Sequence, residues 1–146
     1  MSDPFVTKNI LKWYDLNKRS LPWRKNVSKE KRQYNTLISE FMLQQTQVAT
    51  VIPYFNKFVK EIPNIKKLAS VDNKKLIKLW EGLGYYSRAR NLKKAAQSVI
   101  KNFNGVIPDN FDDLKSLSGI GDYTANAILA IAFNKPYIPI DGNVER

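Results

Sequence analysis

The sequence contains no cysteine and no histidine. Without cysteine the chain forms no disulfide and no thiolate metal site of its own, and without histidine it lacks the commonest metal ligand and general base. Proton chemistry must therefore come from carboxylates, tyrosines or lysines. No apolar run is long enough to span a bilayer, and the first residues lack the basic start and apolar stretch of a signal peptide. We therefore expect an intracellular, cytoplasmic protein.

Basic residues are in large excess. The 146 residues include 24 Lys and Arg against 13 Asp and Glu, which gives a formal net charge of +11. Such an excess suits a polyanionic partner, nucleic acid first and an anionic membrane second, although a lysine-rich surface also serves solubility. With 43% hydrophobic residues, the chain is long enough to fold as one domain around its own core.

The apolar residues recur at helical spacing, and no segment shows the alternation of a strand. This pattern predicts an all-α fold class. The expected helices cover residues 5–16, 34–45, 48–60, 65–69, 73–80, 86–101, 111–117 and 123–133.

Segment 117–128 is an apolar run that ends in a tight Gly-x-Gly turn, and a helix begins at once. Gly119 and Gly121 let backbone N–H groups converge on one point, and the helix start adds free N–H groups and a positive dipole end. We expect these glycines to form a seat for an anion, most readily a phosphate. The alternative is a corner between two helices that only packs.

A second corner, at 82–90, is bracketed by glycines and followed by aromatic residues and arginines. Gly84 permits close approach, Tyr85 offers a ring for stacking, and Arg88 offers a charge for a phosphate. This combination is typical of nucleic-acid binding. The alternative is a helix joint with packed tyrosines and solvated arginines.

Two further segments carry side chains that suit nucleic acid. Trp23 and Arg24 stand in a Leu-Pro-Trp-Arg turn, where the ring can stack on a base and the guanidinium can hold a phosphate. Alternatively, the tryptophan fills the core beside a surface arginine. Gln45 and Thr46 belong to an uncharged polar run, whose amides read base edges or wedge into a stack, or serve as ordinary caps.

Glu40 is a carboxylate inside the broad apolar face of the segment 34–45. If an apolar cleft holds it, desolvation raises its pKa and makes it a candidate proton donor near neutral pH. Periodicity alone favours the ordinary alternative, a solvated glutamate at the edge of the stripe.

Five segments, in this order, resemble the MutY family of adenine DNA glycosylases, within the helix-hairpin-helix superfamily of base-excision enzymes. They are residues 21–24, 39–48, 82–91, 117–125 and 141–144, and the likeness extends from about Trp13 to Arg146. It implies a helix-hairpin-helix glycosylase domain over residues 1–146, with a six-helix lobe at about 24–136 and the hairpin at about 114–128. It also implies a monomer that acts on nucleoid DNA and not on membranes.

The resemblance implies hydrolysis of the N-glycosidic bond of adenine mispaired with 8-oxoguanine or guanine in double-stranded DNA. Glu40 matches the acid that protonates the flipped adenine, and Asp141 matches the carboxylate that stabilises the sugar cation or covalent intermediate. Tyr123 and Asn143 match residues that support this chemistry. A poor leaving group needs an acid of raised pKa, and an oxocarbenium-like sugar needs an ionised carboxylate. The base must also leave the duplex stack.

The resemblance also implies contacts with DNA. Trp23 matches part of the adenine pocket, while Gln45 and Tyr85 match the residues that probe the strand carrying 8-oxoguanine. Gly119 and Gly121 match the hairpin glycines that hold a phosphate of the adenine strand. Such a contact fixes the register of the enzyme without reading sequence.

Endonuclease III, which shares the hairpin and the terminal aspartate, is the nearest alternative. Its lyase chemistry needs a lysine amine, whereas the matching residue here is Tyr123, and Glu40 stands where that relative lacks a carboxylate. A non-catalytic DNA-binding module is a second alternative, which leaves Glu40 and Asp141 unexplained. A membrane-surface protein ranks last, because the basic residues are scattered along the chain.

Full-length chains of the family continue past the Asp-Gly-Asn-Val of 141–144. They carry four cysteines that bind a 4Fe-4S cluster and a C-terminal domain that helps recognise 8-oxoguanine. Those cysteine ligands are absent from these 146 residues. We therefore expect an N-terminal fragment with most of the second lobe missing. Because catalytic groups need close positioning, we expect the fragment alone to be weakly active or inactive.

Overall fold

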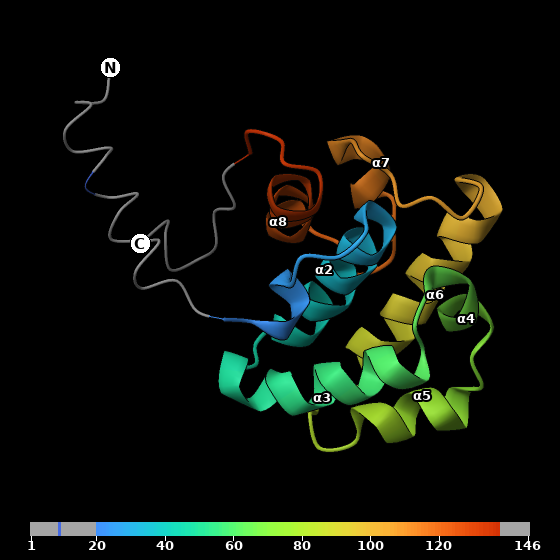
Figure 1. Cartoon of the computed structure of the whole chain (residues 1–146). Helices are drawn as coiled ribbons and strands as arrows, with labels where there is room; N and C mark the ends of the chain where they lie inside the picture. Colours follow the sequence, from blue (N-terminus) through green and yellow to red (C-terminus); the bar gives the residue numbers. More distant parts are fainter. Residues whose placement is uncertain (1–8, 10–19, 138–146) are drawn as a thin grey trace.

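The computed structural model describes residue 9 and residues 20–137, and in this part of the chain every regular element is helical. The absence of strands there confirms the all-α class. The elements are the 3-10 helix η1 (Pro22–Arg24) and the helices α2 (Lys29–Leu43), α3 (Val48–Glu61), α4 (Ile65–Ser70), α5 (Asn73–Trp80), α6 (Ser87–Asn102), α7 (Phe111–Lys115) and α8 (Asp122–Ala132). In Figure 1, α2 lies between α8 and α6, with α3 below it.

The predicted helices agree with the observed ones except at some ends. The clearest difference is α2, which begins at Lys29 and not at residue 34. Its first turn is exposed and carries no apolar stripe, so periodicity misses it. The signal is instead Ser28, whose side chain accepts a hydrogen bond from the backbone N–H of Lys31 at 3.3 Å and caps the helix. The helix expected over 5–16 lies outside the described residues.

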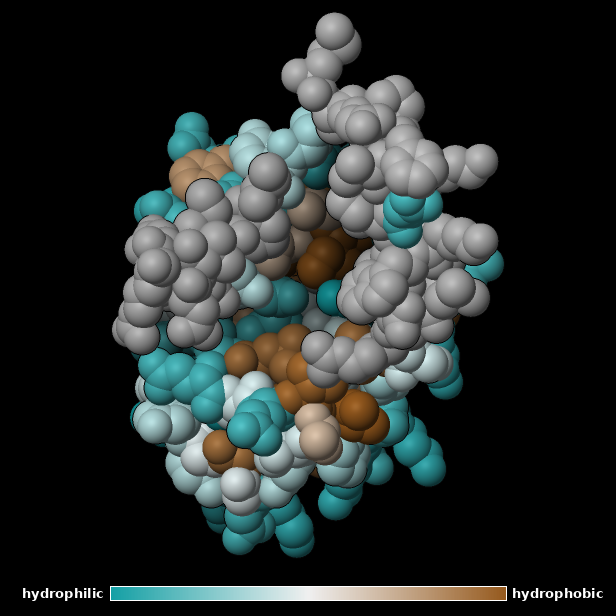
Figure 2. Space-filling model, turned by 90° about the vertical axis from the view of Figure 1, so that its left-hand side faces the viewer, coloured by the Kyte–Doolittle hydropathy of each residue, from teal (hydrophilic) through white to brown (hydrophobic). Residues whose placement is uncertain are grey.

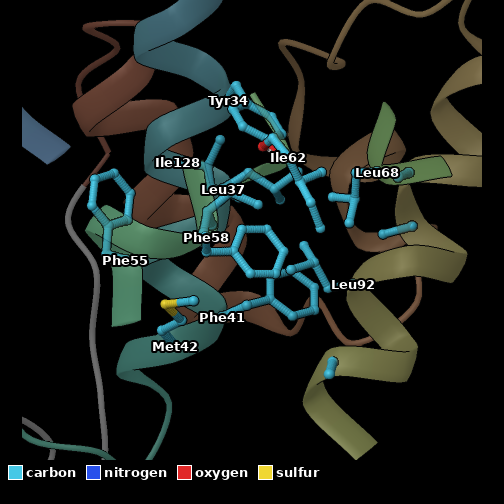
Figure 3. Packing of buried hydrophobic residues seen from close by; sticks show 14 of the residues in the cluster. Tyr34, Leu37, Phe41, Met42, Phe55, Phe58, Ile62, Leu68, Leu92 and Ile128 are labelled. Atoms are coloured by element: carbon cyan, nitrogen blue, oxygen red, sulfur yellow. Dashed lines mark hydrogen bonds between the residues drawn. The ribbon is translucent and has the colours of Figure 1, made fainter. Parts of the chain in front are cut away.

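The hydrophobic core is built around α2, which packs against α3, α6, α8 and η1. Leu37, Ile38, Phe41 and Met42 of α2 are fully buried. Figure 3 shows their side chains meeting those of α3 and α6, with Phe58 among the labelled partners. Each such buried side chain contributes about 1.5–3 kcal/mol relative to exposure. The packing therefore fixes α2 as the rigid support for any group that it carries.

The C-terminal end of α2 lies against the start of α8. The side-chain amide of Gln44, which follows α2, donates to the backbone carbonyl of Gly119 and to the Oγ1 of Thr124, each at 3.3 Å. These bonds join segments that are 75 or more residues apart in sequence.

In the part of the chain that the structure describes, no helix is both long enough and apolar enough to cross a membrane.

Candidate active site and nucleic-acid interface

Glu40 lies in the last turns of α2 and is buried, with 8% of its surface exposed. Glu40 is therefore not the solvated edge residue that periodicity favoured. Burial raises the pKa of Glu40 from 4.5 to about 7, and the positive charge of Arg24 opposes this by lowering it. A carboxyl group with such a pKa holds a proton in a large share of molecules at neutral pH, as a general acid must.

α2, which carries Glu40, packs against α8. Gln44, the C-cap of α2, donates to Gly119 and Thr124 and so ties the end of this helix to the beginning of α8. Tyr123, in the first turn of α8, is 40% exposed. The structure thus brings α2, which carries Glu40, and α8, which carries Tyr123, together in one region.

The hairpin is a tight turn between α7 and α8, held by the buried side chains of Leu117 and Ile120. Gly119 has φ +83°, and a Cβ at this position would lie 2.8 Å from Cε1 of Phe41 and 2.9 Å from Cβ of Asn91. Only glycine satisfies both the left-handed backbone and this close approach. Gly121 is the N-cap of α8, and a Cβ there would meet nothing within 4 Å. Both glycines are exposed, so the backbone here is accessible to a ligand.

Two exposed residues adopt left-handed backbone conformations, each in a turn next to a helix. Gln45, just after α2, has φ 60°, and Tyr85, in the corner before α6, has φ 47°. Tyr85 is 63% exposed. Thr46 is half-buried next to Gln45, and Gly84, with φ +77°, precedes Tyr85 with open space around its Cα. DNA contact by these four residues is predicted from the sequence and stays a prediction.

Arg88 differs from the expectation that its charge meets a phosphate. Its side chain is 7% exposed and is directed into the protein. Its terminal nitrogens donate to backbone carbonyls at the end of α2 and in the 82–86 corner. The physical reason is its position on the buried stripe of α6, one turn before Leu92. Its terminal nitrogens therefore bond within the protein and are not presented to a phosphate.

Trp23 packs in the core, as one of the two alternatives had it. The ring is 4% exposed and meets Phe55 of α3 edge to face, with the ring centroids 5.3 Å apart. Arg24, its neighbour, is exposed and is the positive charge that acts on Glu40. The Leu-Pro-Trp-Arg turn thus anchors a cation next to the buried acid.

Figure 2 shows the side of the molecule that faces left in Figure 1. Near the centre of this side, hydrophobic residues lie above and below a band of hydrophilic ones.

For a metal, the described residues offer no group of three or more Asp, Glu, His or Cys, and the sequence contains neither His nor Cys. The residues present do not fit an iron–sulfur cluster.

A family model described as HhH-GPD superfamily base excision DNA repair protein matches residues 38–146. This range includes Glu40, the hairpin and α8, and covers most of the chain. The chain belongs to this superfamily.

Curated relatives have more specific names. A rat protein named adenine DNA glycosylase is 46% identical over 95% of this chain and 28% of its own length. A protein of the same name from Buchnera aphidicola (subsp. Baizongia pistaciae) is also 46% identical, over 95% of this chain and 39% of its own length. The chain therefore spans less than half of these relatives. A solved structure of a thermostable thymine-DNA glycosylase matches 95% of this chain and 63% of that one, with a TM-score of 0.82 and 26% identity.

Asp141 and Asn143, the other two predicted catalytic residues, lie outside the residues that the structure describes. They fall within the segment that the HhH-GPD model matches. Sequence reasoning missed two features of the region. One is the bridge from Gln44 to the hairpin, and the other is the internal role of Arg88. The helical spacing of Arg88, Leu92 and Val99 contained the second signal, because it places the arginine on an apolar stripe.

Proposed function

We propose that this chain carries the catalytic core of a monofunctional DNA glycosylase that acts in base excision repair. Its substrate is adenine mispaired with 8-oxoguanine or guanine in duplex DNA inside the cell. The single observation that carries the proposal is Glu40, a buried carboxyl group with a pKa of about 7 in a chain of the HhH-GPD superfamily. The identity to proteins named adenine DNA glycosylase supports the choice of base.

In the proposed reaction Glu40 donates its proton to a ring nitrogen of the flipped adenine. The glycosidic bond then breaks, and its electron pair leaves with the base. Asp141, ionised, stabilises the positive charge that develops on the sugar. The oxygen of water finally bonds to C1′ and gives up a proton to solvent, from which the Glu40 carboxylate takes one up again. We assign supporting roles to Tyr123 and Asn143. The opposed protonation states of two carboxyl groups are the same division of work that glycosidases use.

DNA binding is proposed to involve three exposed parts of the lobe at about 24–136. The backbone of Gly119 and Gly121, with the start of α8, holds a phosphate of the adenine strand. A second part, the turns of Gln45–Thr46 and Gly84–Tyr85, faces the strand with 8-oxoguanine. The third part is Arg24 beside the buried Trp23, which supports the wall of the adenine pocket. Binding of these phosphates helps to offset the free-energy cost of flipping the base out of the stack. This cost is smallest at a mispair.

The test is the rate of adenine release by Glu40→Gln. This substitution keeps the shape of the side chain but replaces the carboxyl group with an amide, which cannot act as a general acid. Single-turnover release is measured from a duplex with adenine opposite 8-oxoguanine. Both the 146-residue chain and a chimera, in which the chain replaces the matching region of the rat relative, are assayed. We expect release to fall by about 10²–10⁴-fold while mispair binding is kept. Glu30→Gln, an exposed glutamate on the same helix, is the matched control. Unchanged release in Glu40→Gln refutes the proposal.

Covalent trapping with borohydride distinguishes a lyase from the proposed monofunctional glycosylase. A lysine amine that forms a Schiff base with the sugar is captured covalently by borohydride, whereas Tyr123 forms no imine. We expect no covalent complex with abasic DNA. Robust capture would favour chemistry of the endonuclease III type, and binding without release in the chimera would favour a non-catalytic module.

A further inference from the structure

The guanidinium group of Arg88 joins two separate turns. One terminal nitrogen donates to the carbonyls of Phe41 at 3.4 Å, Met42 at 2.7 Å and Gln44. The other donates to the carbonyls of Leu83 at 3.4 Å and Gly84 at 3.1 Å. The first set lies at the end of α2 and the second in the corner before α6. One side chain therefore fixes the distance between these segments.

The end of α2 provides a natural place for this cation. The last carbonyls of a helix have no partner within it and form the negative end of its dipole. Arg88, from the first turn of α6, supplies both the missing donors and the positive charge. Its planar fork reaches several carbonyls at once, which the single ammonium of a lysine cannot do while bridging both turns. The Arg88 interaction is thus a cap provided by another helix.

Both turns that Arg88 holds contain a strained residue. Gln45 directly follows one of the carbonyls that accept from it, and Tyr85 directly follows another. Each adopts a positive φ, which non-glycine residues keep only where surrounding structure enforces it. The central carbon of the guanidinium also lies 5.6 Å from the ring centroids of both Trp80 and Tyr85. Arg88 thus contacts the buried ring of Trp80 as well as the exposed one of Tyr85.

We propose that Arg88 is a positioning residue that holds Gln45 and Tyr85 in their left-handed conformations at a fixed separation. The two exposed side chains then reach the DNA strand opposite the adenine as one preorganised unit. The second statement rests on the proposed function, whereas the first concerns the protein alone. Arg88 acts through its neighbours and touches neither the base nor the sugar.

The first experiment measures hydrogen exchange of the 146-residue chain without DNA. We compare Arg88→Lys and Arg88→Met with Lys101→Met, which removes a charge from an exposed position on the same helix. In the Arg88 variants we expect exchange to be about tenfold faster or more in peptides covering both residues 43–48 and 82–87. Exchange between residues 92 and 99 should stay as in the unaltered chain. Unchanged protection, loosening of one turn alone, or global unfolding of both variants would each overturn the proposal.

The second experiment measures discrimination between duplexes. In the chimera with the rat relative, affinity is compared for DNA with adenine opposite 8-oxoguanine and for the same duplex with adenine opposite thymine. We expect Arg88→Lys to reduce this ratio by about tenfold while affinity for the ordinary duplex is kept. An unchanged ratio, with both turns loosened, would overturn the DNA-reading part of the proposal. If the unaltered chimera shows no preference, the proposed function fails, and the exchange data still decide whether Arg88 holds the turns.

Discussion

Arg24 and Glu40 form a pair in which an exposed cation acts on a buried acid. Burial raises the pKa of Glu40 to about 7, and the charge of Arg24 keeps it from rising further. The two residues come from different elements, η1 and α2, which pack against each other. The pairing therefore holds the acid near neutrality, where it can both give up and regain a proton.

Removing the charge of Arg24 should raise the pKa of Glu40. In Arg24→Met the desolvation remains and the opposing charge is gone, so the pKa is expected above 7. The titration is followed by ¹³C NMR of the labelled Glu side-chain carboxyl groups. Lys25→Met, which removes the adjacent exposed charge, is the control and should leave the titration close to that of the unaltered chain. An unchanged or lowered pKa in Arg24→Met would contradict the assignment.

Glu40 should also make the stability of the chain depend on pH. Between the unfolded value of 4.5 and the folded value of about 7, the folded state binds the proton more tightly. Stability is therefore highest at the acid end of this window and falls as pH rises to about 7, with no further loss from this group above it. The largest loss is about 3 kcal/mol, from 1.36 kcal/mol per pKa unit.

Urea unfolding at pH 5 and pH 8 checks this dependence. Because other carboxylates also titrate, the quantity of interest is the difference between the unaltered chain and Glu40→Gln. The variant should lose this component and gain stability relative to the unaltered chain at pH 8. Glu30→Gln, an exposed position, should follow the unaltered chain. An identical pH dependence for Glu40→Gln and the unaltered chain would show that Glu40 is not held as described.

The positions of the helices follow from sequence because apolar periodicity, helix caps and turn residues are local signals. The Gly-x-Gly turn predicted the start of α8 to within one residue. The burial of Glu40 and the direction of Arg88 are different, since each depends on which helices pack on α2. A polar residue within or beside an apolar stripe has two readings, and only the tertiary arrangement chooses between them. Trp23 illustrates the same limit, because both a stacking ring and a core ring fit its local sequence.

The two hairpin glycines should differ in their effect on stability. Gly119→Ala places a Cβ against Phe41 and Asn91 on left-handed backbone, so we expect a loss of about 2–4 kcal/mol. Gly121→Ala adds a Cβ in open space with an ordinary φ of −93°, and we expect a loss of at most about 1 kcal/mol. Thermal and urea unfolding of both variants make the comparison. Equal losses would mean that the turn relaxes around Gly119.

Salt dependence of DNA binding should separate the internal arginine from the exposed one. Each phosphate neutralised contributes about −0.9 to the slope of log affinity against log salt. Arg24 is exposed, so Arg24→Met should reduce the magnitude of the slope by about 0.9 if it meets a phosphate as proposed. The terminal nitrogens of Arg88 donate to backbone carbonyls, so Arg88→Met should weaken binding of the mispaired duplex without changing the slope. The measurement is fluorescence anisotropy over a salt series, at a temperature where circular dichroism shows each variant folded. A reduced slope in Arg88→Met would return Arg88 to the phosphate-binding residues, because a side chain buried in the complex cannot release counterions from DNA.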